Sequence, residues 1–133
     1  MSRWAHISAV IRIDIHGKFV TELRDGVIQQ EELDKYASEF ASRMPKMTGS
    51  EGNASVFVNK LPGHSMSKAH WDGKQYVWSE YQTRYCLTII GDLRDRTPQK
   101  TRREFNAALR FLKDELGEDF VWGVAKSIKE MVR

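Results

Sequence analysis

Residues 4–15 have the sequence WAHISAVIRIDI, in which apolar side chains recur at every second position. The apolar positions of one parity are Ile7, Ala9, Ile11, Ile13 and Ile15; between them stand His6, Ser8, Val10, Arg12 and Asp14. Successive side chains of a strand point to opposite faces of its sheet. This period of two therefore predicts a long strand with one buried face and one mostly polar face.

Downstream of Gln30 the spacing changes to that of a helix. The apolar residues there form one stripe of an amphipathic helix: Leu33, Tyr36, Ala37, Phe40, Ala41 and Met44. Pro45 is expected to end the helix, since a proline removes a backbone donor and clashes with the preceding turn. The segment between the first strand and this helix, residues 18–27, fits either a short strand or a loop.

Two further strands are predicted in the middle of the chain. Residues 54–59 alternate and are rich in β-branched side chains, and they follow a turn-rich segment at residues 48–53. Residues 75–90 form a longer strand-like run, which we expect to contain a bulge and to end at Gly91-Asp92. The intervening residues 61–74 hold Pro-Gly and Asp-Gly turn signals, so they predict an extended hairpin or a flexible loop.

A second helix is predicted to begin at Thr97-Pro98, a hydroxyl N-cap followed by proline at the first helical position. The alternative is the capping-box pattern at residues 101–104. Its apolar stripe is Phe105, Ala108, Leu109, Leu112 and Leu116, and Gly117 is the expected stop. The aromatic and β-branched residues 120–124 favour a strand, whereas the apolar run beyond them fits strand or helix.

The order strand, helix, strand, strand, helix, strand predicts one α+β domain over residues 1–133. Two right-handed crossovers with a hairpin between them give a ferredoxin-like βαββαβ sandwich. In that fold a four-stranded antiparallel sheet carries both helices on one face, here with an extended hairpin between strands two and three. A chain of 133 residues that is 41% hydrophobic and 29% charged suits a single domain.

Composition and charge narrow the classes of function. No apolar run approaches the roughly 18 residues of a membrane helix, and no signal-peptide pattern opens the chain, so we expect a cytosolic protein without membrane contact. A lone cysteine, Cys86, permits no internal disulfide and no thiolate cage for zinc. We expect no cofactor and no metal. The net charge of +3 permits an anionic partner.

The predicted topology gathers several polar segments at one end of the sheet. The start of the first strand, the turn before the second, the loop after the third and the start of the second helix become neighbours. A helix N-terminus suits an anion, and cations crowd this one although they oppose its dipole. These residues are either a solvated surface with carboxylate partners or a ligand site. The candidate ligand-binding residues are Trp4, His6, Gly49, Ser50, Glu51, Gly52, Asp92, Arg94, Arg96, Lys100, Arg102 and Arg103.

Two more specific functions of this end of the sheet, a phosphate-binding loop and a metal site, have less support than a general ligand site. The segment 49–52 is shorter than a phosphate-binding P-loop and lacks its lysine. The carboxylates of Glu51, Asp92 and Asp95 could hold a divalent cation, which prefers clustered oxygen ligands. We favour ion pairs with the neighbouring arginines instead.

The open face of the sheet and the predicted hairpin offer alternative surfaces. The face is expected to show His6, Ser8, Arg12, Cys86 and Thr88, with Phe57 or Trp122 beside them. Basic and aromatic side chains on such a face can stack bases, although no RNP-like motif occurs here. A second copy of the chain, or the hairpin, could cover the face instead. The aromatic residues Trp71, Tyr76 and Trp78 make the hairpin a candidate partner-binding arm.

Three blocks of the chain together resemble a family of small uncharacterised proteins encoded by tailed bacteriophages. The blocks are WAHISAVIRID at residues 4–14, GSEG at 49–52 and IIGDLRD at 89–95. In those relatives a cysteine often precedes the second block, where this chain has Thr48, so the resemblance implies no shared thiol role. It implies a viral protein made in the host bacterial cytoplasm, with no activity that can be transferred.

The sequence therefore leads us to expect a non-catalytic, homo-oligomeric phage protein that antagonises host defence. Its expected action is to sequester an anionic ligand such as a signalling nucleotide. The alternatives are a protein-protein inhibitor or assembly factor acting through the aromatic hairpin, and a nucleic-acid-binding module. An enzyme is not expected, because no nucleophile with a base and no glycine-rich cofactor motif stands out.

Overall fold

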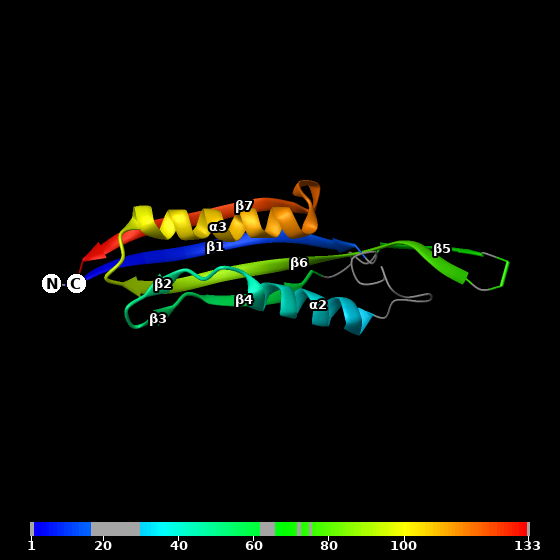
Figure 1. Cartoon of the computed structure of the whole chain (residues 1–133), viewed down its shortest axis with the longest axis horizontal. Helices are drawn as coiled ribbons and strands as arrows, with labels where there is room; N and C mark the ends of the chain where they lie inside the picture. Colours follow the sequence, from blue (N-terminus) through cyan, green and yellow to red (C-terminus); the bar gives the residue numbers. More distant parts are fainter. Residues whose placement is uncertain (1, 17–29, 62–65, 72, 75, 133) are drawn as a thin grey trace.

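A computed structural model describes residues 2–16, 30–61, 66–71, 73–74 and 76–132 (Figure 1). The helices are α2 (Gln30–Arg43) and α3 (Pro98–Leu116), with a short 3-10 turn η1 (Glu118–Phe120). The strands are β1 (Arg3–His16), β2 (Thr48–Gly49), β3 (Gly52–Asn53), β4 (Ser55–Lys60), β5 (Met66–Trp71), β6 (Tyr76–Arg94) and β7 (Val121–Val132).

The four main strands form one antiparallel sheet in the order β4-β6-β1-β7. Strand β1 is central, with Ile7 opposite Gly91 of β6 and opposite Ile128 of β7. The first part of β6 extends beyond this sheet and pairs with β5. The prediction of an α+β chain with a four-stranded antiparallel sheet is confirmed. A two-stranded ladder of β2 and β3 was not predicted, because Thr48 and Asn53 pair inside a segment that looked like a plain turn.

The hydrophobic core lies between one face of the sheet and the two helices. Alternate residues of β1 from Ala5 to Ile15 are buried, as the period of two predicts. Helix α3 packs along β1 and β7, and α2 packs along β4 and β6 (Figure 1). The helices meet where Phe40 stacks on Phe111, with ring centroids 5.2 Å apart. Each fully buried isoleucine stabilises this layer by roughly 1.5–3 kcal/mol.

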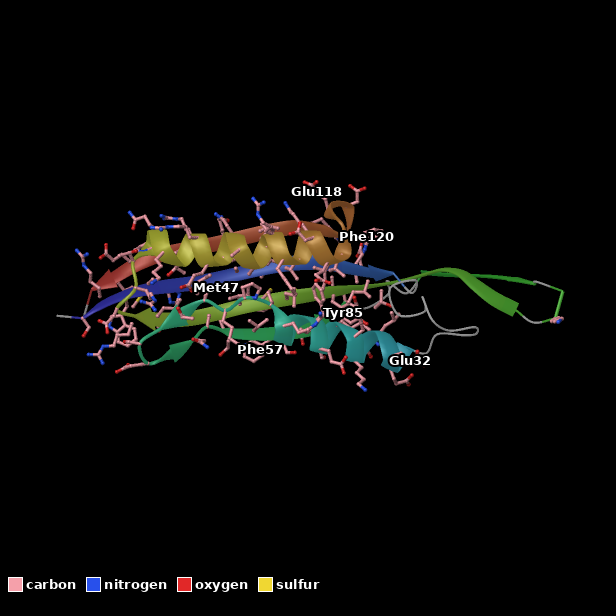
Figure 2. The ribbon with its side chains drawn as sticks, in the orientation of Figure 1. Glu32, Met47, Phe57, Tyr85, Glu118 and Phe120 are labelled. Carbon is pink, nitrogen blue, oxygen red and sulfur yellow. The ribbon has the colours of Figure 1, made fainter. Side chains whose placement is uncertain are left out.

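Helix α2 is also anchored to the sheet by a polar contact. The Tyr85 hydroxyl donates to an Asp34 carboxylate oxygen at 2.7 Å. Figure 2 shows Tyr85 beside α2 and Met47 in the region between α3 and β2. Both side chains are buried, so this part of the core is fixed by packing and by one hydrogen bond to α2.

Helix α3 begins at the first of the two predicted starts. The Thr97 hydroxyl accepts from the Lys100 N–H at 3.2 Å, and Pro98 follows the cap. The alternative capping box is wrong, because Thr101 is buried inside the helix and Glu104 bonds elsewhere. Gly117 ends the helix with φ of 98°, a conformation that favours glycine.

Strand β6 runs further than the sequence suggested. Gly91 and Asp92 were expected to end it, yet they pair with Ile7 and His6 of β1, and the strand continues to Arg94. The chain turns at Asp95, which has φ of 60° and donates its N–H to the Arg3 carbonyl at 2.8 Å. A Gly-Asp pair is typical of a turn, but pairing with β1 keeps Gly91 and Asp92 in an extended conformation.

Two other uncertain segments have different outcomes. Beyond η1 the chain is strand β7 throughout, so the apolar run to Val132 is not helical. The expected irregularity of the long strand lies in its hairpin part, where the β5–β6 register shifts between Lys68 and Ala69. Residues 18–27 lie outside the described part of the chain.

Among the residues that are described, no helix is long and apolar enough to cross a membrane.

Candidate functional site

The predicted polar end of the sheet exists, and we call it the strand-end cluster: Trp4, His6, Thr48 to Gly52, Asp92, Arg94 to Arg96, and Glu104. Backbone hydrogen bonds assemble it, since the Ser50 N–H donates to the Arg94 carbonyl at 3.0 Å. The β2–β3 turn thereby sits against the end of β6. The topology brings together the segments that the sequence analysis placed there.

Glycines permit this close approach of two backbones. A Cβ atom on Gly49 would lie 3.0 Å from the Arg94 nitrogen and from the Leu93 Cα. A Cβ atom on Gly91 would lie 2.8 Å from the Ala54 Cα, closer than Cβ atoms are found in proteins. Both glycines therefore serve packing between β6 and the segment before β4. Neither backbone position indicates a ligand.

The acidic groups of the strand-end cluster have partners within it. Glu51 pairs with Arg94, and Asp92 pairs with the His6 ring. The Ser50 hydroxyl donates to the Asp95 carboxylate at 2.7 Å. Ion pairing at these carboxylates, which we favoured over a cation site, is thus the observed arrangement for Glu51. Within the described part of the chain, no group of three or more potential ligands could hold a metal.

The arginines of the strand-end cluster are also engaged. Arg94 lies over the Trp4 ring at 5.8 Å and donates to the Ser2 hydroxyl at 3.1 Å. Arg96 donates from Nε to the Thr48 carbonyl at 2.9 Å. A ligand anion at either guanidinium would have to compete with these internal acceptors.

Glu104 completes the cluster and was not among the predicted site residues. Its carboxylate accepts from the Thr48 N–H at 2.6 Å and from the Thr48 hydroxyl at 2.9 Å. These two bonds join helix α3 to the β2–β3 ladder. The sequence signal was present as the last residue of the capping-box pattern, but that pattern pointed to a cap within α3.

Three predicted cations remain at the start of α3, namely Lys100, Arg102 and Arg103. All three are exposed, and none forms an ion pair with a described residue. The helix N-terminus beside them is mostly satisfied, because Thr97 accepts the Lys100 N–H and the Thr101 N–H. These three side chains therefore have no ion-pair partner among the described residues, whereas most backbone N–H groups that could bind an anion already donate to Thr97.

The open face of the sheet carries a second group, which we call the sheet-face cluster: Arg12, Asp14, Arg84 and Trp122. Arg12 lies opposite Trp122 on β7 and opposite Cys86 on β6. Both guanidiniums lie over the indole, Arg12 at 5.2 Å and Arg84 at 5.0 Å from the ring centroid. Such cation-π contacts hold an arginine in place while leaving its N–H edges free.

The two arginines of the sheet-face cluster differ in charge balance. Arg84 lies 3.3 Å from Asp14, whose side chain is nearly buried. Arg12 is exposed and has no carboxylate partner in the described residues. A bulge brings the chain close here, and Gly123 leaves room for the Arg12 stem, which lies 3.0 Å from where a Cβ would be. Arg12 is thus positioned but not neutralised.

The rest of the open face agrees with the predicted set. Ser8, Cys86 and Thr88 lie on it, with Cys86 only half-buried. Phe57 is 53% exposed and Ile90 is 45% exposed. Figure 2 shows Phe57 on the outer strand β4. The face therefore combines apolar, hydroxyl and cationic groups along four strands.

Asp14 was predicted on the polar side of its strand, but Arg84 and its pairing with Asp14 were not predicted. Their pairing follows from the register of β1 and β6, in which they stand directly opposite each other. The sequence shows each residue in its own strand but not the alignment of the two. Opposite charges across a predicted strand pair would be the signal for such a contact.

The hairpin aromatics can be placed only by their backbone. Trp71 pairs with Tyr76, and Trp78 pairs with Ala69, in the ladder of β5 and β6. The extended hairpin is therefore present. Their side chains lie outside the described part of the structure, and their role in binding a partner stays a prediction.

Comparison with family models, with curated proteins and with solved structures gives no match. The function is therefore argued from the geometry of the two clusters.

Proposed function

We propose that the chain is a non-catalytic binding protein for an anionic ligand that carries an aromatic ring, the chemistry of a nucleotide, and that the ligand lies on the open sheet face. The observation that carries the proposal is Arg12. It is an exposed arginine, held over an indole, with no carboxylate partner among the described residues. Its fork of N–H donors suits a phosphate.

The surroundings of Arg12 supply the other half of such a ligand. A ligand ring would stack on the planar guanidinium of Arg12 or Arg84 rather than on Trp122, because the indole already contacts both arginines. The hydroxyls of Ser8 and Thr88 on the same face can accept or donate hydrogen bonds. At the strand-end cluster, by contrast, Arg94 and Arg96 already have internal partners. This difference moves the proposed site from the predicted end of the sheet to its face.

The fold proposed for this binding protein is the ferredoxin-like sandwich with an added hairpin. Numbered along the chain, the four main strands lie in the order second, third, first, fourth, and neighbours are antiparallel. Both helices pack on the same face, and no helix of the described residues covers the other. The phage resemblance of the three sequence blocks adds the context in which we place it: sequestration of a signalling nucleotide, against host defence, in the bacterial cytoplasm.

The test is a titration of the protein with nucleotide probes, followed by isothermal calorimetry. The probes are a mononucleotide, a cyclic dinucleotide and a single-stranded oligonucleotide. Arg12→Gln should weaken binding at least tenfold, whereas the matched variant Arg102→Gln at the start of α3 should change it less than twofold. The reverse pattern would place the ligand at the predicted helix end. Failure of all three probes to bind overturns the proposal.

The same titration separates a small nucleotide from a nucleic acid. A nucleic-acid ligand contacts several phosphates, so its affinity falls steeply as salt rises, because releasing the condensed counterions is less favourable at higher salt. Preference for the oligonucleotide together with a steep salt slope would favour the nucleic-acid-binding alternative. A shallow slope with the small probe supports nucleotide binding.

A further inference from the structure

The two outer strands of the main sheet differ in how well they are protected against pairing with another chain. Strand β7 carries a bulge near Gly123 and exposed charges at Lys126, Lys129 and Glu130. Bulges and charges are the usual devices that keep an edge strand from adding a partner. Strand β4 pairs with β6 in an unbroken register and has no charged residue before Lys60. Its edge is the unprotected one.

The register of β4 shows which of its backbone groups are free. The Leu61 N–H donates to the Arg84 carbonyl at 3.0 Å, in the same register that pairs Phe57 with Thr88. In an antiparallel ladder alternate residues bond to the same neighbour. Residues 55, 57, 59 and 61 therefore point their polar groups to β6, while Val56 and Val58 point theirs outward. No described strand pairs with that outer side.

The side chains in the middle of the same edge are apolar, whereas Ser55 and Asn59 flank them. Val56 and Val58 are half-buried against the core, and Phe57 projects from the open face. A surface hollow of about 410 Å³ runs beside them between α2 and β4, lined in part by Ala41 and Ala54. A strand added at this edge would find backbone donors and acceptors together with apolar contacts.

We propose that β4 pairs with β4 of a second copy of this chain, antiparallel about a two-fold axis at Phe57. In this register Val56 faces the partner's Val58, and each pair exchanges backbone hydrogen bonds. Phe57 faces the partner's Phe57 as a non-hydrogen-bonded pair, in which side chains approach most closely. Ser55 faces the partner's Asn59. No charge opposes itself, so the edge is complementary to its own copy, as a closed dimer requires.

In the dimer the four main strands of each copy join into one continuous sheet, because the two-fold axis is perpendicular to the sheet. Both open faces then lie on the same side. The interface of one short strand from each copy is small compared with stable dimers, so dimerisation is expected to depend on concentration. This inference does not rest on the proposed ligand.

Sedimentation of the whole chain across a range of concentrations tests the proposal. The wild type should approach twice its mass of 15.4 kDa as concentration rises. Val58→Pro should stay monomeric, since its N–H points outward and is not needed for pairing with β6. Circular dichroism checks that this variant is folded. A wild type that is monomeric throughout, or a folded Val58→Pro that dimerises like the wild type, overturns the proposal.

A charge swap at Phe57 tests the two-fold axis itself. Phe57→Lys and Phe57→Glu should each be monomeric, because like charges then meet, and a mixture of the two should dimerise. A mixture that stays monomeric overturns the register. Ile90→Lys is the matched control, being similarly exposed on the next strand. Loss of the dimer in this control would show face-to-face packing of the sheets instead.

Discussion

The strand-end cluster and the sheet-face cluster hold the same kinds of residue but use them differently. At the strand end, Arg94 and Arg96 bind acceptors of the protein itself. On the sheet face, Arg84 is neutralised by Asp14, whereas Arg12 lies over an indole and has no carboxylate partner among the residues that the structure describes. A concentration of arginines therefore does not mark a ligand site. The useful distinction is whether each guanidinium already has an internal acceptor.

The largest expected effect is on stability, and it concerns the pair of Arg84 and Asp14 in the sheet-face cluster. Arg84→Met should destabilise the protein by about 3 kcal/mol, because it leaves the nearly buried Asp14 carboxylate unpaired. Chemical denaturation measures this loss. The double variant with Asp14→Asn should recover most of it. If Arg84→Met is as stable as the wild type, the pair is not structural and Arg84 joins Arg12 as a free cation.

The next effect concerns the strand-end cluster. Glu104→Ala should cost about 2 kcal/mol, because the Thr48 N–H and hydroxyl lose a charged acceptor. Glu115→Ala, an exposed position of the same helix, is the control and should change stability little. Equal stability of the two variants would mean that the β2–β3 ladder holds without α3.

A smaller effect is expected for the surface ion pair of the same cluster. A double-mutant cycle of Arg94→Ala and Glu51→Ala should give a coupling free energy of about 0.5 kcal/mol, since both side chains are partly exposed. The coupling should shrink at high salt. A coupling above about 2 kcal/mol would show a pair that is far better shielded than its exposure indicates.

The smallest effect on stability should come from the residue that matters most for the proposed function. Arg12→Gln should change the free energy of unfolding by about 0.5 kcal/mol at most, because Arg12 is exposed, has no ion pair in the described structure and loses only an exposed cation-π contact with Trp122. Denaturation of the purified variant gives this value. A loss of more than about 1 kcal/mol would make Arg12 a structural residue, and the two clusters would no longer differ.

Much of the fold follows from local periodicity. The alternation of residues 4–15 and the stripe from Leu33 to Met44 each depend on neighbours in the sequence, and both elements form where they were predicted. The end of β6 and the β2–β3 ladder were missed because pairing with distant segments overrides local turn signals. Gly91 and Asp92 remain extended since β1 provides their partners.

The candidate sites show the same limit more sharply. Most members of the strand-end cluster could be predicted from the topology, since the strand ends meet as expected, whereas Glu104 there and Arg84 on the sheet face were not predicted. The state of each charge could not, because whether an arginine is satisfied depends on register and on turns such as the one at Asp95. Arg94 and Arg12 look alike in the sequence. They differ in the structure because Glu51 pairs with Arg94, whereas Asp14 pairs with Arg84 and not with Arg12.

The length of β6 has a mechanical consequence. The strand β6, roughly 60 Å long and with one register shift in its hairpin part, pairs with β5 at one end and with β1 and β4 at the other. A load applied at the hairpin tip and resisted at the start of β1 would act along these antiparallel ladders. The hydrogen bonds between β6 and β1 would then be strained in parallel rather than opened one after another. The hairpin is in this sense joined to the sheet through the backbone of β6 itself, and a force on it is transmitted along that strand.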